Sequence, residues 1–497
     1  MTETAAMIKE VFKDKIKDKF VVLHFDGKSV EEITDSRKLT NERIAVVITG
    51  PELEGEQVLG VVVAPSSKGS DQERAIIALL QEWEVTERIV ALCCDTTASN
   101  TGQWRGACVL LQETLGRSLL NTLCNHHIPE LHIKTVAAAV SQRGSKGPKE
   151  LLFGRLQSNW NKILDTGINY DDLSVLTESQ LSEDLLERAE EVKVFAEEVL
   201  SNETFQRGEY RQLVQLIYVY LGGHISSFKF ATPGAYHRAR FMSQALYYLK
   251  WALLMKQFGH LLSAEEALEV QEMAKFIALF YGQWWLESPM AASAPANCLK
   301  AFDQMFKYER ENPVVAKACL DSLNRHTTYI SPPLVVFALA DQNLSYQERS
   351  EIAEKLVSFE KKDSFPPKKQ KEPKVEKEMW NQEGKRPSLA AFVGPDSWLV
   401  FHLLQFKPDD LEWLQCDSSL WDLSVGYTRF EFFVKNLSIV NDCSERGVKL
   451  IEDLVGAAQQ EGLRQDIMVS VADARKKMPK VTKANLIKRT INNNNEL

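Results

Sequence analysis

Three acidic side chains that lie far apart in the sequence could together hold divalent metal ions. Asp26 and Asp95 each follow a short apolar run typical of a buried strand, and Glu445 lies near the start of a predicted late helix. Carboxylates at strand ends point into the crevice where α/β sheets bind ligands, and their oxygens suit Mg²⁺. Two such ions about 3.5–4 Å apart neutralise the attacking and leaving oxygens of a phosphodiester. Because 68 residues are acidic, spacing alone still favours ordinary caps and turns for these three.

The elements that must position these acids form a predicted α/β fold in the first 150 residues. Apolar and β-branched runs predict five strands, at 20–26, 44–48, 58–63, 88–94 and 119–123. Helical spacing predicts two helices between them, at 71–83 and 103–115. A hairpin of the second and third strands, followed by a crossover, indicates a mixed five-stranded sheet covered by helices. We expect this core to span 20–148, after a helical segment at 1–19.

The rest of the chain is predicted to be mostly helical, as a large all-α insertion at 149–436 that interrupts the core. Helical spacing is clearest at 181–200, 211–220, 235–258, 264–285 and 350–360. The charged, proline-containing stretch 361–386 is expected to be a mobile loop. A final core helix is expected within 437–474, from about Val440 to Leu454, before a basic tail at 475–497.

Charge and composition restrict the partners only in part. The net charge of -9 argues against nucleic acid, but binding depends on where the positive charge lies. The two basic stretches, 361–386 and the tail, are either solvated or disordered surface or contact sites for DNA. No apolar run approaches the ~20 residues that cross a bilayer, so no membrane partner is expected. Eight scattered cysteines fit a reducing, intracellular compartment, and no nucleotide signature or nucleophile elbow predicts a small-molecule substrate.

The local sequences around the acids resemble the hAT family of transposases. His24-Phe25-Asp26-Gly27-Lys28 resembles the family's Asp-Gly-Trp strand end, and Asp95-Thr96-Thr97-Ala98-Ser99-Asn100 resembles its Asp-Asn-Ala-Ser-Asn block. Cys124-Asn125-His126-His127 supplies the Cys-x-x-His that follows this block. Asp442-Cys443-Ser444-Glu445-Arg446 resembles the Ser-Glu-Arg helix that bears the last acid. The four motifs occur in family order, with the long helical region between the third and the fourth.

The resemblance implies a ribonuclease-H-like core and a DDE-type transposase. Asp26, Asp95 and Glu445 would be its catalytic and metal-binding triad, with two Mg²⁺ or Mn²⁺ ions. Water and then a DNA 3′-hydroxyl would attack phosphodiesters held there. The implied partner is DNA, at transposon ends or at a target, and the implied location is the nucleus. The sequence leaves the oligomeric state open, a homo-oligomer included.

The resemblance also marks four residues of lesser weight. Cys124 and His127 would support the active site, although a packed thiol and a hydrogen-bonded core histidine are the favoured interpretation, because two ligands do not make a zinc site. His126 would instead face the metals or DNA. Trp160 is a candidate to stack a flipped base, a role that the family gives to a Trp in its insertion. With ten tryptophans in the chain, core packing is favoured for Trp160.

A separate cluster after Pro233-Gly234 could contact DNA phosphates. The two residues open a predicted helix, whose first N–H groups favour an anion. His237, Arg238 and Arg240 follow in the next turns and suit phosphate contacts. An ordinary helix start with solvated charges is an equal alternative.

One departure from the family pattern bears on function. The family usually places a zinc-bearing DNA-recognition domain before the core, whereas about twenty residues without Cys or His precede the first strand here. We therefore do not expect sequence-specific recognition of DNA ends by this chain alone. The alternative function is a domesticated, non-catalytic DNA- or protein-binding protein that keeps the transposase fold. A helical interaction scaffold with incidental acids is a third.

Overall fold

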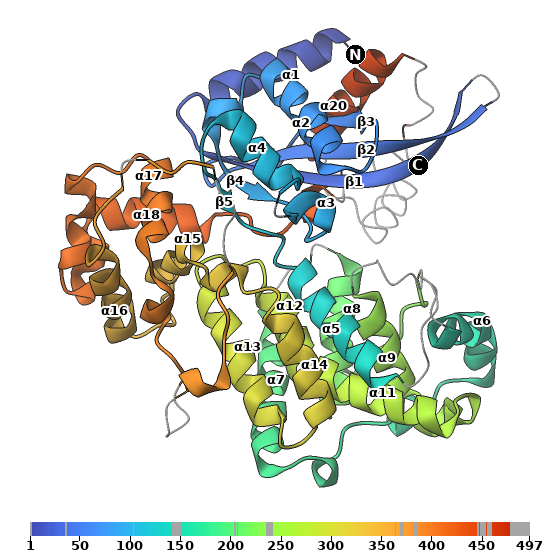
Figure 1. Ribbon diagram of the computed structural model, residues 1–497. Helices are drawn as coiled ribbons and strands as arrows, with labels where there is room; N and C mark the ends of the chain where they lie inside the picture. Colours follow the sequence, from blue (N-terminus) through green and yellow to red (C-terminus); the bar gives the residue numbers. More distant parts are fainter. Residues whose placement is uncertain are drawn as a thin grey trace, which may run out of the picture.

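The computed structural model forms a sheet region and a helical region that lie against each other (Figure 1). The structure describes residues 2–34, 37–102, 104–141, 151–202, 205, 207–234, 242–362, 364–367, 372–380, 386–444, 447, 454 and 460–477. The sheet region holds the first 121 residues together with a helix from the C-terminal part of the chain, and the helical region holds most of the remainder.

The sheet has five strands in the order β3-β2-β1-β4-β5. The strands are β1 (Val21–Thr34), β2 (Arg37–Thr49), β3 (Gln57–Ala64), β4 (Ile89–Cys93) and β5 (Leu120–Asn121). β2 pairs antiparallel with both β1 and β3, whereas β4 lies parallel to β1 and β5 lies parallel to β4. The prediction of a mixed five-stranded sheet is confirmed.

The first strand is longer than its sequence predicts, so the prediction that it ends at Asp26 is wrong. The Asp26-Gly27 pair is a common turn signal, but β1 continues because β2 continues opposite it, with Asp26 paired to Ala45. The parallel ladder with β4, in contrast, ends where His24 faces Cys93. Asp26 therefore lies just beyond the point where the pairing of β1 with β4 ends. The rest of β1 and β2 projects from the sheet as a two-stranded ribbon (Figure 1).

Helices cover both faces of the sheet. Val46 of β2 belongs to the large core that includes α2 (Gly69–Glu82), whereas its neighbour Val47 packs with Ala472 of α20 (Glu461–Lys477). Successive side chains of a strand point to opposite faces, so this alternation shows cover on each side. Three more helices belong to this region, α1 (Thr2–Ile16), α3 (Ala98–Thr101) and α4 (Ala107–Leu115).

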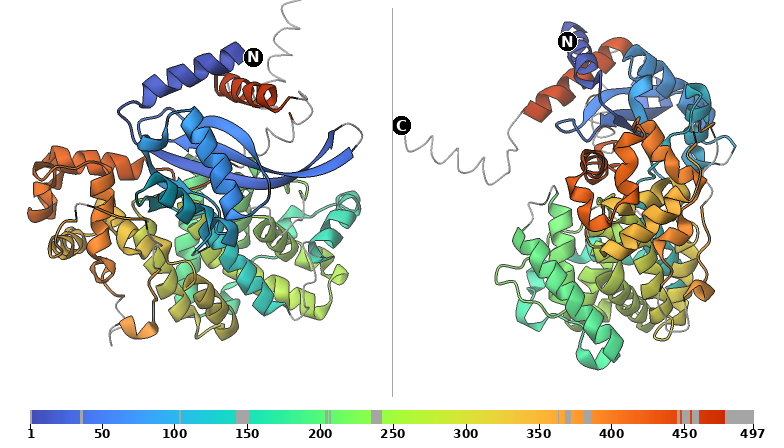
Figure 2. Two further views of the ribbon diagram at one scale, coloured as in Figure 1. Left: turned by 45° about the horizontal axis from the view of Figure 1, so that its top comes forward. Right: turned by 90° about the vertical axis from the view of Figure 1, so that its left-hand side faces the viewer.

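The helix α20 was not predicted from the sequence as a separate element. Arg43 of β2 is only 1% exposed, and its guanidinium makes two hydrogen bonds of 2.9 Å to the Glu461 carboxylate. The Val61 N–H donates to Gln465 Oε1 at 2.7 Å. These bonds hold α20 against β2 and β3, beside α1 in both views of Figure 2. The late helix predicted from Val440 is described as helical at 442–444, 447 and 454.

Every element described between Leu151 and Lys435 is helical. The α-helices after the sheet are α5 (His127–Val140), α6 (Leu151–Thr166), α7 (Glu183–Asn202), α8 (Gly208–Tyr220), α9 (Ser243–Leu253), α10 (Met255–Phe258), α11 (Ala264–Phe276), α12 (Gly282–Glu287), α13 (Ala294–Tyr308), α14 (Pro313–Leu323), α15 (Pro332–Val335), α16 (Tyr346–Val357), α17 (Leu399–Leu403) and α18 (Val425–Lys435). A π-helical turn joins α11 to α12, so the helix predicted at 264–285 is one continuous run. No helix within the described ranges combines the length and apolar character needed to cross a bilayer.

The described parts of the stretch 361–386 are held on the helices at Val375 and Trp380, and the mobile loop stays a prediction. Val375 is 2% exposed, and its N–H donates to Asn324 Oδ1 at 2.9 Å. The indole N–H of Trp380 donates to Asp303 at 2.9 Å. The few apolar residues of this charged stretch serve as anchors on the helices, which composition alone does not reveal.

Candidate functional site

Asp26 and Asp95 come together where the parallel ladder of β1 and β4 ends. The last pair of that ladder joins His24 to Cys93, and each aspartate lies two residues beyond its member of the pair. Burial, and then the charge of Asp95, raise the pKa of the half-buried Asp26 carboxyl to about 7. Two carboxylates that share a site in this way do not both ionise readily unless a positive charge joins them.

Asp95 is oriented by its own loop, which leads into α3. Its Oδ1 atom accepts hydrogen bonds from the Thr97 N–H at 3.1 Å, from the Thr97 hydroxyl at 2.7 Å and from Asn100 Nδ2 at 2.5 Å. Among the residues that the structure describes, no donor bonds to Oδ2. One oxygen thus fixes the carboxylate, and the other is available to a ligand.

The segment that precedes Glu445 is fixed next to these aspartates. Asn441 donates its backbone N–H to the Cys124 sulfur at 3.1 Å and its side-chain N–H to the Phe25 carbonyl at 3.0 Å. Since Phe25 directly precedes Asp26, this second bond places the segment against β1 at the site. Glu445 itself lies outside the described residues, and its place beside the two aspartates stays a prediction.

Asp442 joins the site to the helical region through a polar network. Its Oδ1 atom lies 2.9 Å from His126 Nδ1, and its Oδ2 atom accepts a hydrogen bond from the Tyr210 hydroxyl at 2.7 Å. The His126 ring stacks on the Trp285 indole, with ring centroids 3.9 Å apart and planes within 1° of parallel. Tyr210 belongs to α8 and Trp285 to α12, so two helices contact the site directly.

Cys124, in the loop after β5, and His127, the first residue of α5, are the two predicted supporting residues and lie beside the acids. Cys124 is a buried free thiol whose pKa is raised by burial, and its N–H donates to the Cys94 carbonyl, next to Asp95, at 2.8 Å. Burial lowers the pKa of His127, and the charge of Asp95 acts in the opposite direction. The structure thus brings Cys124, His126 and His127 to the same place as Asp95.

The other predicted DNA contacts do not join this group in the described structure. Trp160 is 3% exposed and packs edge-on against Phe230 inside the helical region, with ring centroids 6.3 Å apart. His237, Arg238 and Arg240 lie outside the described residues.

Sequence reasoning missed Asn441, Asp442, Tyr210 and Trp285 as members of the site. The first two adjoin the Ser-Glu-Arg motif, and a search of the motif's flanks could have found them. No sequence signal singles out one of 12 tyrosines and one of ten tryptophans, because 232 residues separate Tyr210 from Asp442.

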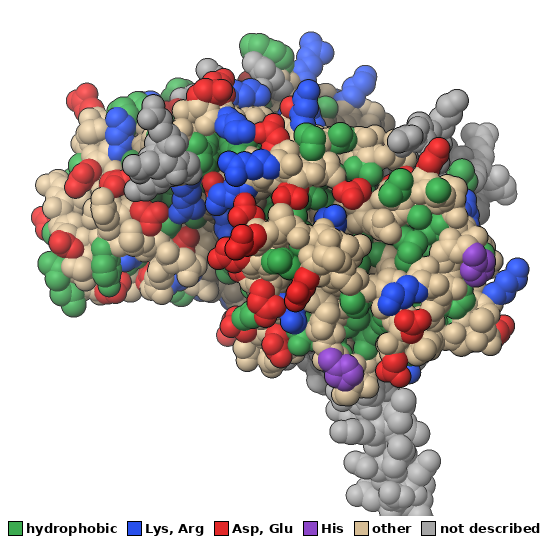
Figure 3. All heavy atoms as spheres, turned by 90° about the horizontal axis from the view of Figure 1, so that it is seen from below, with side chains coloured by type: hydrophobic (Ala, Val, Ile, Leu, Met, Phe, Trp, Pro, Cys, Tyr) green, Lys and Arg blue, Asp and Glu red, His purple; other side chains and the backbone are tan. Residues whose placement is uncertain are grey.

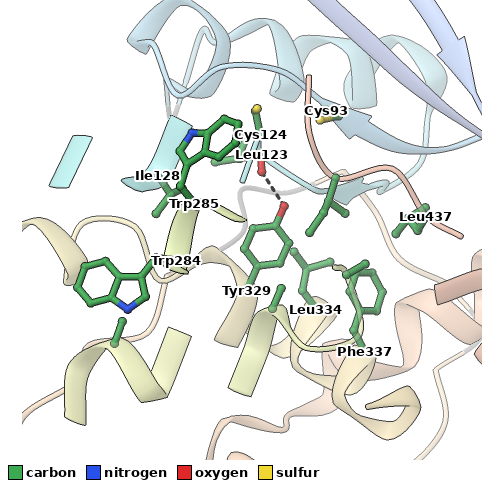
Figure 4. Packing of buried hydrophobic residues seen from close by; sticks show 14 of the residues in the cluster. Cys93, Leu123, Cys124, Ile128, Trp284, Trp285, Tyr329, Leu334, Phe337 and Leu437 are labelled. Atoms are coloured by element: carbon green, nitrogen blue, oxygen red, sulfur yellow. Dashed lines mark hydrogen bonds between the residues drawn. The ribbon is translucent and has the colours of Figure 1, made fainter. Parts of the chain in front are cut away.

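The site stands on a core that continues from the sheet region into the helical region. In Figure 4, Leu123 and Cys124 of the sheet side meet Trp285 and Tyr329 of the helical side. The Tyr329 hydroxyl donates to the Leu123 carbonyl at 2.6 Å. The elements that carry the site therefore share one packed interior, which resists independent movement of its parts.

A second concave feature lies away from the aspartates, on the helical region. It is a groove of about 770 Å³ lined in part by α7 and α13. One ion pair spans the groove, with Lys300 of α13 3.4 Å from Glu191 of α7, and another lies along α13, with Lys307 3.0 Å from Asp303. Figure 3 shows the lower face of the molecule, where Lys and Arg side chains lie beside Asp and Glu side chains. The described part of that face therefore carries mixed charge instead of a continuous basic field.

Two further findings concern metal binding and the likeness of the sequence to known proteins. Within the described ranges, no three His, Cys, Asp or Glu side chains form a group able to hold a metal ion. Asp26 and Asp95 supply two of the three predicted ligands, and the third is Glu445. No protein-family model matches the sequence, and no curated protein matches it.

Proposed function

We propose that the chain is a hAT-like DNA transposase, or a protein derived from one, that cleaves and transfers DNA strands with divalent metal ions. The observation that carries the proposal is the meeting of Asp26 and Asp95 at one sheet edge, with Asn441 bonded to the Phe25 carbonyl beside them. This arrangement places the segment that leads to Glu445 where a third carboxylate would complete the site. The proposal implies DNA as partner and a nuclear location.

The topology supports a ribonuclease-H-like core. The antiparallel run of β3, β2 and β1, followed by the parallel β4 and β5, is the arrangement that such a core has. The elements that the structure describes from Leu151 to Lys435 are all helical and lie between β5 and the Asn441 segment in the sequence, which supports an insertion within that core. Both assignments belong to the proposal.

The residues present fit a divalent cation. The Asp26 carboxyl lies beside a like charge and carries a raised pKa, and Asp95 presents an oxygen that no described donor occupies. Asp26, Asp95 and the predicted Glu445 would hold the ions. Bound Mg²⁺ would supply charge neutralisation for the oxygens of the scissile phosphate. Asp95 would keep its orientation through Thr97 and Asn100, as the outer partners of metal ligands do.

Strand cleavage by the full chain tests this function. Labelled hairpin or nicked DNA is incubated with the protein in Mg²⁺ or Mn²⁺, and the variants are Asp26→Asn and Asp95→Asn. Each variant should lose about 10²–10³-fold in rate, because metal ions supply several kcal/mol of charge stabilisation. Glu287→Gln is the matched control, since Glu287 is also a half-buried carboxyl with a pKa raised by burial. Cleavage that both aspartate variants retain would refute the proposal.

A non-catalytic DNA- or protein-binding protein with the same fold is the second candidate. The net charge of -9 and the mixed charge in Figure 3 favour it, because a transposase needs positive surface to neutralise DNA phosphates. Such a protein would keep its affinity for DNA in Asp26→Asn, and the unaltered chain would cleave no strand. Gel-shift and cleavage measurements on the same samples separate the two candidates.

A further inference from the structure

We propose that Asp442 is a positioning residue: with Tyr210 and His126 it fixes the segment that leads to Glu445, so that the helical region sets the affinity of the acidic site for divalent cations. The inference rests on the proposed function. It goes beyond that function because it gives α8 and α12 a role in cation binding that the three predicted ligands do not require.

The contacts of Asp442 are those of a residue held in one orientation. The residue is 8% exposed, and its two carboxylate oxygens bond in different directions, Oδ1 to His126 and Oδ2 to Tyr210. His126 is itself clamped by its stack on Trp285, and Tyr210 lies edge-on to the same indole with centroids 4.6 Å apart. A buried carboxylate with charge-assisted bonds from two elements has little freedom to turn.

Asp442 directly follows Asn441, which makes the contacts that hold this segment at the site. Its neighbour Asn441 bonds to the Phe25 carbonyl and to the Cys124 sulfur. The charges of Asp442 and Asp95 both act to raise the pKa of His127. Asp442 also begins the helical stretch 442–444. Glu445 follows it by three residues in the sequence.

The network joins parts of the chain that would otherwise act separately. The Tyr210 hydroxyl is the contribution of α8, and the Trp285 indole is the contribution of α12. Removing the hydroxyl would leave one carboxylate oxygen without its tyrosine donor inside a buried site, and the Asp442 segment would relax. Loss of an outer partner typically costs 10–100-fold in metal affinity.

Mn²⁺ binding to the full chain tests the inference without any DNA. Free Mn²⁺ is measured by electron paramagnetic resonance for the unaltered chain, Tyr210→Phe, Asp442→Asn and Asp26→Asn. Tyr248→Phe is the matched control, because the Tyr248 hydroxyl also donates to a buried carboxylate, Glu269, at 2.7 Å. Urea unfolding of each variant reports its stability in parallel.

We expect Tyr210→Phe to raise the Kd for Mn²⁺ about 10-fold and Asp442→Asn to raise it at least as much. Tyr248→Phe should change this Kd less than about twofold while losing a similar free energy of unfolding. Saturating Mn²⁺ should restore strand cleavage to Tyr210→Phe but not to Asp26→Asn.

Three results would overturn the inference. If Tyr210→Phe binds Mn²⁺ as tightly as the unaltered chain while Asp26→Asn does not bind it, Asp442 has no positioning role and the proposed function stands. If Tyr248→Phe weakens binding as much as Tyr210→Phe, the effect is one of general stability. If the unaltered chain binds no Mn²⁺, the inference and the proposed function both fail.

Discussion

Two half-buried carboxyl groups, Asp26 at the sheet edge and Glu130 on α5, have a raised pKa for different reasons. Burial raises the pKa of Glu130 to about 7, although the Tyr281 hydroxyl donates to it at 2.6 Å and the Met242 N–H at 2.7 Å. Burial also raises the pKa of Asp26 to about 7, but the next cause is the charge of Asp95. Glu130 accepts hydrogen bonds from two protein donors, whereas Asp26 lies beside the like charge of Asp95.

This difference separates a structural acid from a candidate ligand. Within the described ranges, only the backbone of Gly27 acts as a hydrogen-bond donor to Asp26. Acids whose pKa is perturbed by a neighbouring like charge gather at functional sites, whereas buried acids with full sets of donors are common in ordinary cores. A bound cation would stabilise the ionised carboxylate of Asp26, as the hydrogen bonds from Tyr281 and Met242 stabilise that of Glu130.

The largest expected effect is the response of stability to Mn²⁺. At a concentration 100 times the Kd, the ion should stabilise the unaltered chain by about 2.7 kcal/mol through mass action. Asp26→Asn should gain nothing, and Glu130→Gln should gain as much as the unaltered chain. Urea unfolding with and without Mn²⁺ measures this. Equal stabilisation of both variants by Mn²⁺ would contradict the assignment of Asp26, and not Glu130, as a cation ligand.

The second effect concerns the donors of Glu130. Tyr281→Phe should lower the free energy of unfolding by about 2 kcal/mol, because it leaves the half-buried Glu130 carboxyl with one donor fewer. Thr166→Ala is a fitting control, since its exposed hydroxyl donates to the Lys162 carbonyl of its own helix. A loss as small as that of the control would mean that these hydrogen bonds do not stabilise the Glu130 carboxyl.

The smallest effect is a gain in stability from Asp26→Asn without cations. An acid whose pKa is higher in the folded chain than in the unfolded chain destabilises the fold when ionised. This cost is complete above pH 7 and disappears as the pH falls towards 4. We expect Asp26→Asn to be about 1–2 kcal/mol more stable than the unaltered chain at pH 8, with the difference vanishing near pH 4. A difference that does not depend on pH would contradict this account of Asp26.

The sequence was sufficient to predict the sheet, because its strands are runs of apolar and β-branched residues with clear breaks between them. The expectation that Asp26 and Asp95 lie at the crevice of the sheet agrees with their place just beyond the ladder of β1 with β4, whereas their role as metal ligands stays a prediction. It failed at Gly27, where the turn signal is overridden by the continuing pairs of β1 with β2. The length of a hairpin depends on both strands, and local residues describe only one.

Interactions between distant parts of the chain could not be predicted. Arg43 and Glu461 are separated by 418 residues, and no local pattern shows that a buried arginine of β2 will select a glutamate of α20. The contact between Tyr210 and Asp442 is of the same kind. Both depend on how the helical region packs against the sheet, which is decided by the shape of the whole core.

If Asp26 and Asp95 form the basis of a cation site, a bound cation must displace the proton that Asp26 carries near neutral pH. Calorimetric titration of Mn²⁺ into the full chain, repeated in buffers of different ionisation enthalpy, counts the protons released. Since the pKa of Asp26 is about 7, we expect roughly half a proton to be released at pH 7 and almost none at pH 8.5. Absence of binding, or binding at pH 7 without release of a proton, would contradict such a site.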